Sequence, residues 1–272
     1  MFTLDLPLLN RLEAIAKDAG HEILKIYDTD FNVQTKSDDS PLTAADLAAH
    51  NVIIDALATL TPDIPVLSEE SASIPFDTRS SWSQYWLVDP LDGTKEFVKR
   101  NGEFTVNIAF IDNHTPTLGV VYCPVKEIMY SAAEGLGAFK TMPGEERKSI
   151  HCTPSIKAPI RVVGSRSHGG DALVNIFNNI GTFELITMGS SLKICLVAEG
   201  AADIYPRLGL TSEWDTAAAH AIVLAAGGQL TLTDQTPLTY NTKDSLLNPY
   251  FLAYGDDSIS WAEHFQNHNH NQ

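Results

Sequence analysis

The sequence predicts an α+β first lobe followed by an α/β second lobe. Apolar residues recur at helical spacing over about residues 6–27 and again over about 43–60. Between residues 104 and 140, segments rich in β-branched and aromatic residues are separated by turn residues, which is typical of an antiparallel meander. After residue 160, short apolar strands alternate with helical patterns, which indicates α/β structure.

The first lobe is expected to contain two helices and a run of strands. A short strand is expected at 31–35 and a polar loop at 36–41. An apolar strand over 64–67 leads into Ser68-Glu69-Glu70, and the segment 71–83, rich in Ser, Pro and Asp, predicts a loop. The strands of the meander are expected at 104–112, 118–123, 127–132 and 137–140.

The second lobe is expected to begin within the polar stretch 141–158, which carries two prolines and a basic cluster. We therefore expect lobes at 1–150 and 151–272. Two glycines at 227 and 228 are a C-cap signal for a helix over 216–226. The other elements are expected as strands at 160–164, 183–187, 202–205, 230–233 and 251–254, and as helices at 171–180, 191–198 and 258–265.

The composition narrows the class of function. Lys+Arg 18 against Asp+Glu 34 leaves a net charge of −16, which disfavours nucleic-acid polymers and anionic membrane surfaces as partners. The cysteines, Cys123, Cys152 and Cys195, show no C-x-x-C spacing, so we expect reduced core thiols. Neither a signal peptide nor a membrane span is expected, and the predicted location is cytoplasmic.

The most informative stretch is Asp89-Pro90-Leu91-Asp92-Gly93-Thr94, which follows the apolar run 85–88. Pro90 fixes φ and lacks an N–H, so the strand is expected to end there. Two carboxylates then lie at the C-terminal end of a strand, a position that ligands favour in α/β sheets. Carboxylate and carbonyl oxygens suit Mg²⁺. An Asx-rich turn without any ligand is the alternative.

The full D-P-L-D-G-T resembles the metal-binding signature of the inositol monophosphatase superfamily. The longer WLVDPLDGTKEFVKRNGEFTVNIAFI is similar to the branch that removes the 3′-phosphate from adenosine 3′,5′-bisphosphate. The D-x-D-G-T motif of haloacid-dehalogenase phosphatases is a competing match, but there the two aspartates are separated by one residue and here by two. The resemblance implies a layered αβαβα sandwich and attack by water rather than by an aspartate.

The resemblance also implies a metal site that uses residues from distant motifs. Ser68-Glu69-Glu70 matches the family's [GS]-E-E element. The match implies that Glu69 binds the metal and that Glu70 supports the ligands without binding the metal itself. Without the resemblance, a solvated loop is the simpler interpretation. Trp214-Asp215 matches the second signature, whereas an isolated Asp215 would be interpreted as a helix N-cap. The implied ligands of two or three Mg²⁺ ions are Glu69, Asp89, Asp92, Asp215 and the carbonyl of Leu91.

Thr94 and Asp46 are implied to prepare the water for attack. Thr43-Ala-Ala-Asp46 matches the family's T-x-x-D, whose Asp accepts the hydroxyl proton of the signature Thr. Thr94 would then orient the attacking water, with Glu69 beside it. Judged without the family, Thr43 and Asp46 form a capping-box-like helix start.

Several further residues are expected to contact the nucleotide. The amides of Gly93 and Thr94 are placed to bind phosphate oxygens. Gly189-Ser190-Ser191-Leu192-Lys193 opens a predicted helix, and Arg207 precedes the second signature. The resemblance places substrate contacts in these segments, and Ser190, Lys193 and Arg207 are the candidates, with Glu69, Leu91, Asp92 and Asp215 at the metal end. The roles of Lys36, Arg166 and His168 stay open.

The resemblance therefore implies Mg²⁺-dependent hydrolysis of adenosine 3′,5′-bisphosphate to AMP and phosphate, with the sulfated 5′-analogue also accepted and lithium as an inhibitor. An inositol or sugar phosphatase is the nearest alternative, and a non-catalytic binder of metal and a phosphorylated metabolite is the alternative from a different class. The expected partner is a small nucleotide. By resemblance alone the protein would be a monomer or homodimer, with peripheral association at the inner face of the membrane left open.

Overall fold

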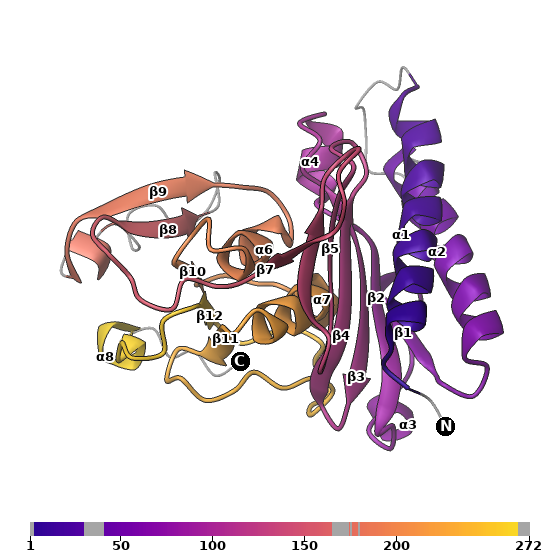
Figure 1. The fold of residues 1–272 in the computed structure, drawn as a ribbon. Helices are drawn as coiled ribbons and strands as arrows, with labels where there is room; N and C mark the ends of the chain where they lie inside the picture. The colour runs from indigo at the N-terminus through magenta and orange to yellow at the C-terminus, as the bar shows by residue number, and fades with distance from the viewer. Residues whose placement is uncertain (1–2, 30–40, 165–173, 175, 179, 266–272) are drawn as a thin grey trace.

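The computed structural model describes residues 3–29, 41–164, 174, 176–178 and 180–265. Within them the chain forms five layers (Figure 1). Helices α1 (Leu6–Tyr27) and α2 (Pro41–Leu60) cover one face of a large sheet; α6 (Leu192–Ala198) and α7 (Glu213–Ala225) lie between this sheet and a smaller one; α8 (Trp261–Phe265) covers the outer face of the smaller sheet. This is the layered αβαβα sandwich that the resemblance implies.

The larger sheet has seven strands in sequence order, β1 to β7. β1 pairs with β2 in parallel, and each later pair is antiparallel, so the expected meander is confirmed. The strands are β1 (Val66–Ser68), β2 (Gln84–Asp92), β3 (Thr105–Asp112), β4 (Thr115–Cys123), β5 (Ile128–Ala133), β6 (Gly137–Thr141) and β7 (Lys148–Ile150).

The smaller sheet has five strands in the order β11-β12-β10-β8-β9. β10, β8 and β9 are parallel neighbours, and β12 runs antiparallel to both β10 and β11. The strands are β8 (Ile160–Gly164), β9 (Phe183–Thr187), β10 (Ile204–Arg207), β11 (Gln229–Leu232) and β12 (Phe251–Tyr254).

Alternation along the strands supplies both faces of the larger sheet. Along β2, Trp86 and Val88 join the core beneath α1 and α2, whereas Tyr85 and Leu87 join the core shared with α6 and α7. Gly119 of β4 permits the close approach of α7, because a Cβ there would lie 2.1 Å from the carbonyl oxygen of Ala218. Helix α7 is thereby held against the sheet that carries the first signature.

Helix ends follow the local sequence. The Asp5 side chain accepts a hydrogen bond from the Leu8 N–H at 2.9 Å and caps α1. After α7, Gly227 adopts a φ of 87°, and the N–H groups of Gly227 and Gly228 bond the carbonyls of Leu224 and Val223. The Gly-Gly C-cap signal is therefore confirmed.

Several element boundaries differ from the expected ones. Helix α2 begins at Pro41, so Thr43 does not open it, and α7 begins at Glu213 rather than at 216. The segment expected as the loop 71–83 contains the short helix α3 (Phe76–Arg79). The polar stretch 141–158 contains β7, whose alternation is too short to predict.

Some expectations fall partly or wholly on residues that the structure does not describe. The expected strand 31–35 and nearly all of the loop 36–41 lie outside the described residues, as do Lys36, Arg166 and His168. Of the expected helix 171–180, residues 174, 176–178 and 180 are described and are helical. The division into lobes at residue 150 stays a prediction.

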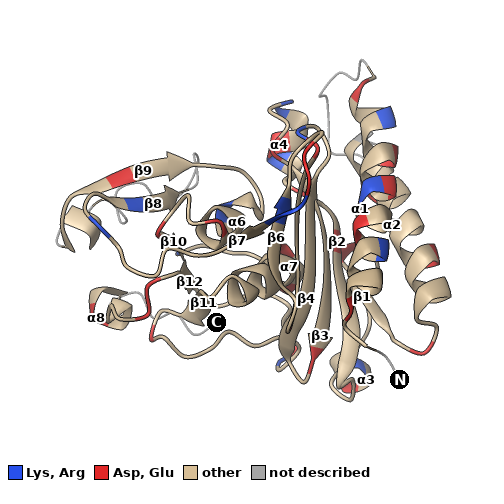
Figure 2. Ribbon diagram, in the orientation of Figure 1, with Lys and Arg blue, Asp and Glu red and all other residues tan. Residues whose placement is uncertain are grey.

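Charged residues of both signs are mixed over the helices and loops of the fold. Acidic and basic residues are interspersed along α1 and the connecting loops, whereas the strands of the larger sheet carry few (Figure 2). Cys123, Cys152 and Cys195 are buried free thiols, as expected. Over the described ranges, no helix is long and apolar enough to cross a membrane.

Candidate functional site: an acidic cluster beside a basic pocket

A β-bulge places both aspartates of the first signature on one face of the sheet. Contrary to the expectation that Pro90 ends it, β2 continues to Asp92. Asp89 pairs with Asn107 and Asp92 with Thr105, so two residues of β2 oppose one of β3. Proline is tolerated at a bulge because no ladder hydrogen bond is required of it there.

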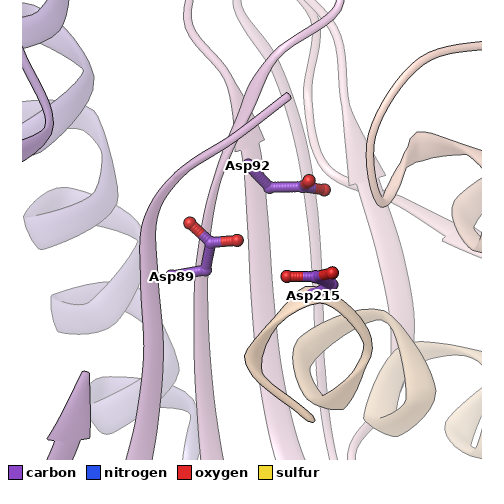
Figure 3. Close-up of side chains that lie close together, drawn as sticks. All are labelled: Asp89, Asp92 and Asp215. Carbon is purple, nitrogen blue, oxygen red and sulfur yellow. The ribbon is translucent and has the colours of Figure 1, made fainter. Parts of the chain in front are cut away.

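The bulge shifts the alternation of β2 by one residue. Before it, odd-numbered residues face α6 and α7; after it, Leu91 packs in the core beneath α1 and α2, so Asp92 returns to the face of Asp89. Without the extra residue, positions 89 and 92 would face opposite sides of the sheet. The bulge therefore brings both carboxylates to the same face of the sheet, close to Asp215 (Figure 3).

Asp215 reaches the same point from α7. It is the third residue of the helix, not the N-cap that an isolated aspartate suggests; Ser212 is the N-cap. The two form a capping box in which the Ser212 N–H donates to Asp215 Oδ2 at 2.9 Å. Carboxylate oxygens of Asp89, Asp92 and Asp215 all lie within 4.8 Å of one another.

Burial and mutual repulsion make this cluster unfavourable without a cation. Asp89 is 1 % exposed, and burial, followed by the charges of Asp92 and Glu69, raises its pKa well above the ordinary value. Burial and then Asp92 raise the pKa of Asp215 to about 8. Burial also raises the pKa of Asp92, although Lys193 and the Ser191 N–H oppose the shift. An all-oxygen donor set of this kind fits hard divalent cations.

Glu69 lies beside the cluster, where β1 ends in a short 3₁₀ turn, Glu69–Ser71. Burial of the carboxyl group and the charges of Asp92 and Glu70 raise its pKa to about 7, while hydrogen bonding to Asp89 and Trp214 opposes the shift. Among the described residues, the close group contains the three aspartates and not Glu69. Glu69 is thus a neighbour of the cluster: the residue as a whole is exposed, but its carboxyl end is buried enough for the pKa to rise.

Asp46 is a buried carboxyl group close to Glu69 and Glu70. Burial and then the charge of Glu70 raise its pKa to about 8. Its Oδ1 is buried with no hydrogen-bond partner within the described part of the chain. Thr94 is exposed at the start of α4 (Thr94–Val98), which lies against α2. No hydrogen bond between Thr94 and Asp46 is present in the described ranges, so their pairing stays a prediction.

A pocket of about 150 Å³ opens from the acidic cluster. Asp92, Gly93 and Asp215 are among the residues that line it, together with Ser190, Lys193 and Arg207, whose role as substrate contacts stays a prediction. Lys193 Nζ donates to the Ser190 carbonyl at 2.6 Å and lies 5.7 Å from the centre of the Tyr205 ring. Arg207 Nη2 donates to the Leu210 carbonyl at 2.7 Å, and its Nε is buried without a partner among the described residues.

The apolar lining of this pocket is not evident in the sequence. Met188, Ile194, Tyr205 and Phe251 contribute it from separate elements. Leu91 and Thr94, by contrast, do not line the pocket. Strand β10 carries Tyr205 and Arg207 as alternate residues, with Pro206 between them. Residues two apart on a strand face the same side, so this spacing could have indicated that Tyr205 and Arg207 contribute to one pocket.

Comparison with known proteins agrees with the fold. The profile of the inositol monophosphatase family matches residues 6–265. The chain is 52% identical over 246 residues to the 3′(2′),5′-bisphosphate nucleotidase CysQ of Escherichia coli (strain K12), covering 90% of this chain and 98% of that protein. It is 37% identical over 267 residues to CysQ of Haemophilus influenzae, covering 98% and 99%.

Solved structures give the same result. The crystal structure of CysQ from Bacteroides thetaiotaomicron superposes with a TM-score of 0.79 at 43% identity, covering 90% of this chain and 97% of the other. The inositol monophosphatase of Anabaena has a TM-score of 0.73 at 24% identity, covering 96% and 95%, and supports the fold alone. With its two signatures brought together at one acidic cluster, the chain belongs to the inositol monophosphatase family.

Proposed function

We propose that this protein hydrolyses the 3′-phosphate of adenosine 3′,5′-bisphosphate in a Mg²⁺-dependent reaction, giving AMP and phosphate. The observation that carries the proposal is one pocket that is lined both by Asp92 and Asp215 of the acidic cluster and by the basic side chains of Lys193 and Arg207. The relatives described above, named as bisphosphate nucleotidases, support the choice of substrate. The sulfated 5′-analogue is proposed as a further substrate.

The acidic residues present fit hard divalent cations, and we propose two or three Mg²⁺ ions. Asp89, Asp92 and Asp215 would hold them, with Glu69 and the Leu91 carbonyl completing the oxygen ligands. Bound there, the ions would neutralise phosphate charge and lower the pKa of water. Asp89 is preorganised for this role because its Oδ1 accepts the Leu91 N–H at 3.0 Å.

The basic residues of the pocket are the reason for proposing a substrate with two phosphate groups. The acidic cluster with its cations would engage one phosphate, so the second needs a separate cationic partner. On a chain with a net charge of −16, that partner must be local. Lys193 and Arg207 are positioned for it, and a guanidinium can grip phosphate with two parallel hydrogen bonds.

Thr94 and Asp46 are proposed to orient the attacking water. Asp46 has a buried oxygen without a partner among the described residues and lies on the helix against which α4 packs. An acceptor in this state suits the hydroxyl proton of Thr94, which would leave the Thr94 oxygen free to accept a proton from water. The pairing would form when Thr94, now exposed, turns towards α2.

Replacement Thr94→Ala is expected to lower kcat by about 10²–10⁴-fold, the range typical of assistance by a positioned general base. Cation binding should stay close to that of the wild type because the hydroxyl orients water rather than the ion. Thr78→Ala, a threonine of the short helix α3, is a matched control. An increase in KM with unchanged kcat would show that Thr94 binds substrate instead.

The proposed reaction is tested by phosphate release from adenosine 3′,5′-bisphosphate with Mg²⁺ and with EDTA. Mass spectrometry of the nucleotide product should show AMP with Mg²⁺ and unchanged substrate with EDTA. A protein that only binds metal and a phosphorylated metabolite would release no phosphate under either condition. The cytoplasmic location and the oligomeric state stay predictions.

A further inference from the structure

A chain of buried hydroxyl and amide groups adjoins Asp92 and has no part in the proposed reaction. Thr105 and Asn107 belong to β3, and Ser191 is the N-cap of α6; each is at most 3 % exposed. The Ser191 N–H donates to Asp92 Oδ2 at 2.6 Å, and the Ser191 hydroxyl donates to Asn107 Oδ1 at 2.8 Å. Ser191 therefore contacts a carboxylate of the acidic cluster and a neighbouring amide at the same time.

The hydrogen bonds of this chain run in one direction. The single hydroxyl proton of Ser191 goes to Asn107, so the Thr105 hydroxyl is the donor in its 2.8 Å contact with Ser191 Oγ, and it shares its proton with the more distant Ser190 Oγ at 3.3 Å. In this arrangement the Asn107 amide directs its oxygen towards Ser191. Its Nδ2, which carries two protons, is the opposite end of the group.

Asn107 Nδ2 is buried and has no hydrogen-bond partner among the described residues. Buried donors of this kind are uncommon and call for an acceptor. The register places Asn107 opposite Asp89, and Thr105 opposite Asp92, on the face that carries the acidic cluster. The Asp92 carboxylate is the acceptor that this amide already influences, because Asn107 opposes the rise that burial causes in the pKa of Asp92.

We propose that Asn107 and Ser191 are positioning residues that orient the carboxylates of Asp89 and Asp92 for cation binding. Ser191 holds Asp92 through its backbone N–H and holds Asn107 through its hydroxyl, and Asn107 donates to the carboxylates when they turn to bind a cation. Ser191 and its neighbour Ser190 also line the substrate pocket, so this chain joins the pocket wall to the cation site. The inference rests on the proposed function only in taking the cluster as a cation site.

Two replacements separate orientation from packing. Asn107→Leu keeps a similar volume and removes the amide. Ser191→Ala removes the hydroxyl but keeps the N–H that bonds Asp92. Groups that hydrogen-bond metal ligands typically change metal affinity by about 10–100-fold, so we expect Asn107→Leu to raise the Kd for Mn²⁺ within this range. Ser191→Ala should raise it less, because it acts through Asn107.

The measurement is titration of the metal-free full chain with Mn²⁺, followed by the electron paramagnetic resonance of the free ion. Because Ser191 acts through Asn107, the double variant should bind Mn²⁺ no more weakly than Asn107→Leu alone. Ser131→Ala is the matched control: Ser131 is another buried serine, and its hydroxyl donates to Glu13 on α1. It should lower Tm without changing Mn²⁺ affinity.

Affinities of both variants within about threefold of the wild type would overturn the proposal, because the network would then be structural only. Additive losses in the double variant would also overturn it, since Ser191 would not act through Asn107. If Asn107→Leu does not fold, the Mn²⁺ affinity of Ser191→Ala decides alone. A wild type that binds no Mn²⁺ would overturn the proposed function as well, so the two failures are distinguishable.

Discussion

Asp89→Asn and Asp92→Asn are each expected to abolish phosphatase activity while leaving the fold intact. Stabilisation of a phosphoryl group by bound cations contributes several kcal/mol to the barrier, and each 1.36 kcal/mol is tenfold in rate, so kcat should fall by at least about 10³-fold. Asparagine preserves the shape of the side chain. In Asp89→Asn the remaining carbonyl oxygen can still accept the Leu91 N–H.

The same variants should be more stable than the wild type when no metal is present. Carboxyl groups with raised pKa values, such as Asp215 at about 8, keep their protons in the folded state while the unfolded chain ionises near pH 4. The folded state then binds more protons, so the free energy of unfolding falls as pH rises from about 4 to 8. Removal of one carboxylate reduces this fall in the free energy of unfolding, and divalent cations that bind the cluster reverse the fall in the wild type.

Thermal unfolding at pH 8 with and without Mg²⁺, measured beside kcat, checks both expectations. The Tm of the wild type should rise on addition of Mg²⁺. The Tm of Asp89→Asn should be higher than that of the wild type without Mg²⁺ and should rise less when Mg²⁺ is added. Asp63→Asn, at an exposed position before β1, is the matched control and should behave as the wild type does. Activity retained in EDTA, or an aspartyl-phosphate trapped on Asp89, would contradict attack by water in a cation-dependent site.

Arg207→Ala is expected to weaken the bisphosphate selectively. Each lost charged hydrogen bond contributes about 1.5–3 kcal/mol, which corresponds to roughly 10–150-fold in kcat/KM. The loss should appear with adenosine 3′,5′-bisphosphate and be much smaller with 3′-AMP, which has no 5′-phosphate. Lys193→Ala should have the same selectivity, with an added loss on both substrates because Lys193 also stabilises the charge of Asp92.

The ratio of kcat/KM values for the two nucleotides is the quantity to compare between variants. Arg11→Ala, an exposed arginine of α1, is the control for loss of positive charge elsewhere and should leave the ratio unchanged. Equal losses on both nucleotides in Arg207→Ala would mean that this side chain supports the fold of the pocket through Leu210 rather than binding the second phosphate.

Most helices and strands could be predicted because their apolar residues recur with a clear period, whereas the arrangement of these elements in layers was implied only by the resemblance to the family. Helix α1 and the strands β3 to β6 carry clear periods, and these elements lie close to their expected positions. The continuation of β2 past Pro90 could not be predicted, because a bulge depends on the register of the neighbouring strand. Strand β7 was missed since it has only three residues and borders a polar stretch.

The acidic cluster could be predicted from the sequence, whereas the residues that hydrogen-bond around it could not. Asp89, Asp92 and Asp215 come together as the two signatures imply. Asn107 and Ser191 were not singled out, because an asparagine in a strand and a serine at a helix start have ordinary structural explanations. The available signal was a polar residue inside the otherwise apolar Val-Asn-Ile-Ala-Phe of β3, where burial requires a partner.

The most direct test of the proposed function is the substrate preference of the wild-type protein. In one Mg²⁺-containing buffer, kcat/KM should be measured for adenosine 3′,5′-bisphosphate, 3′-AMP and inositol 1-phosphate. A cationic partner for the second phosphate predicts that the bisphosphate exceeds 3′-AMP by at least about tenfold, with inositol 1-phosphate lower still. A preference for inositol 1-phosphate, or equal values for the two nucleotides, would contradict the proposal.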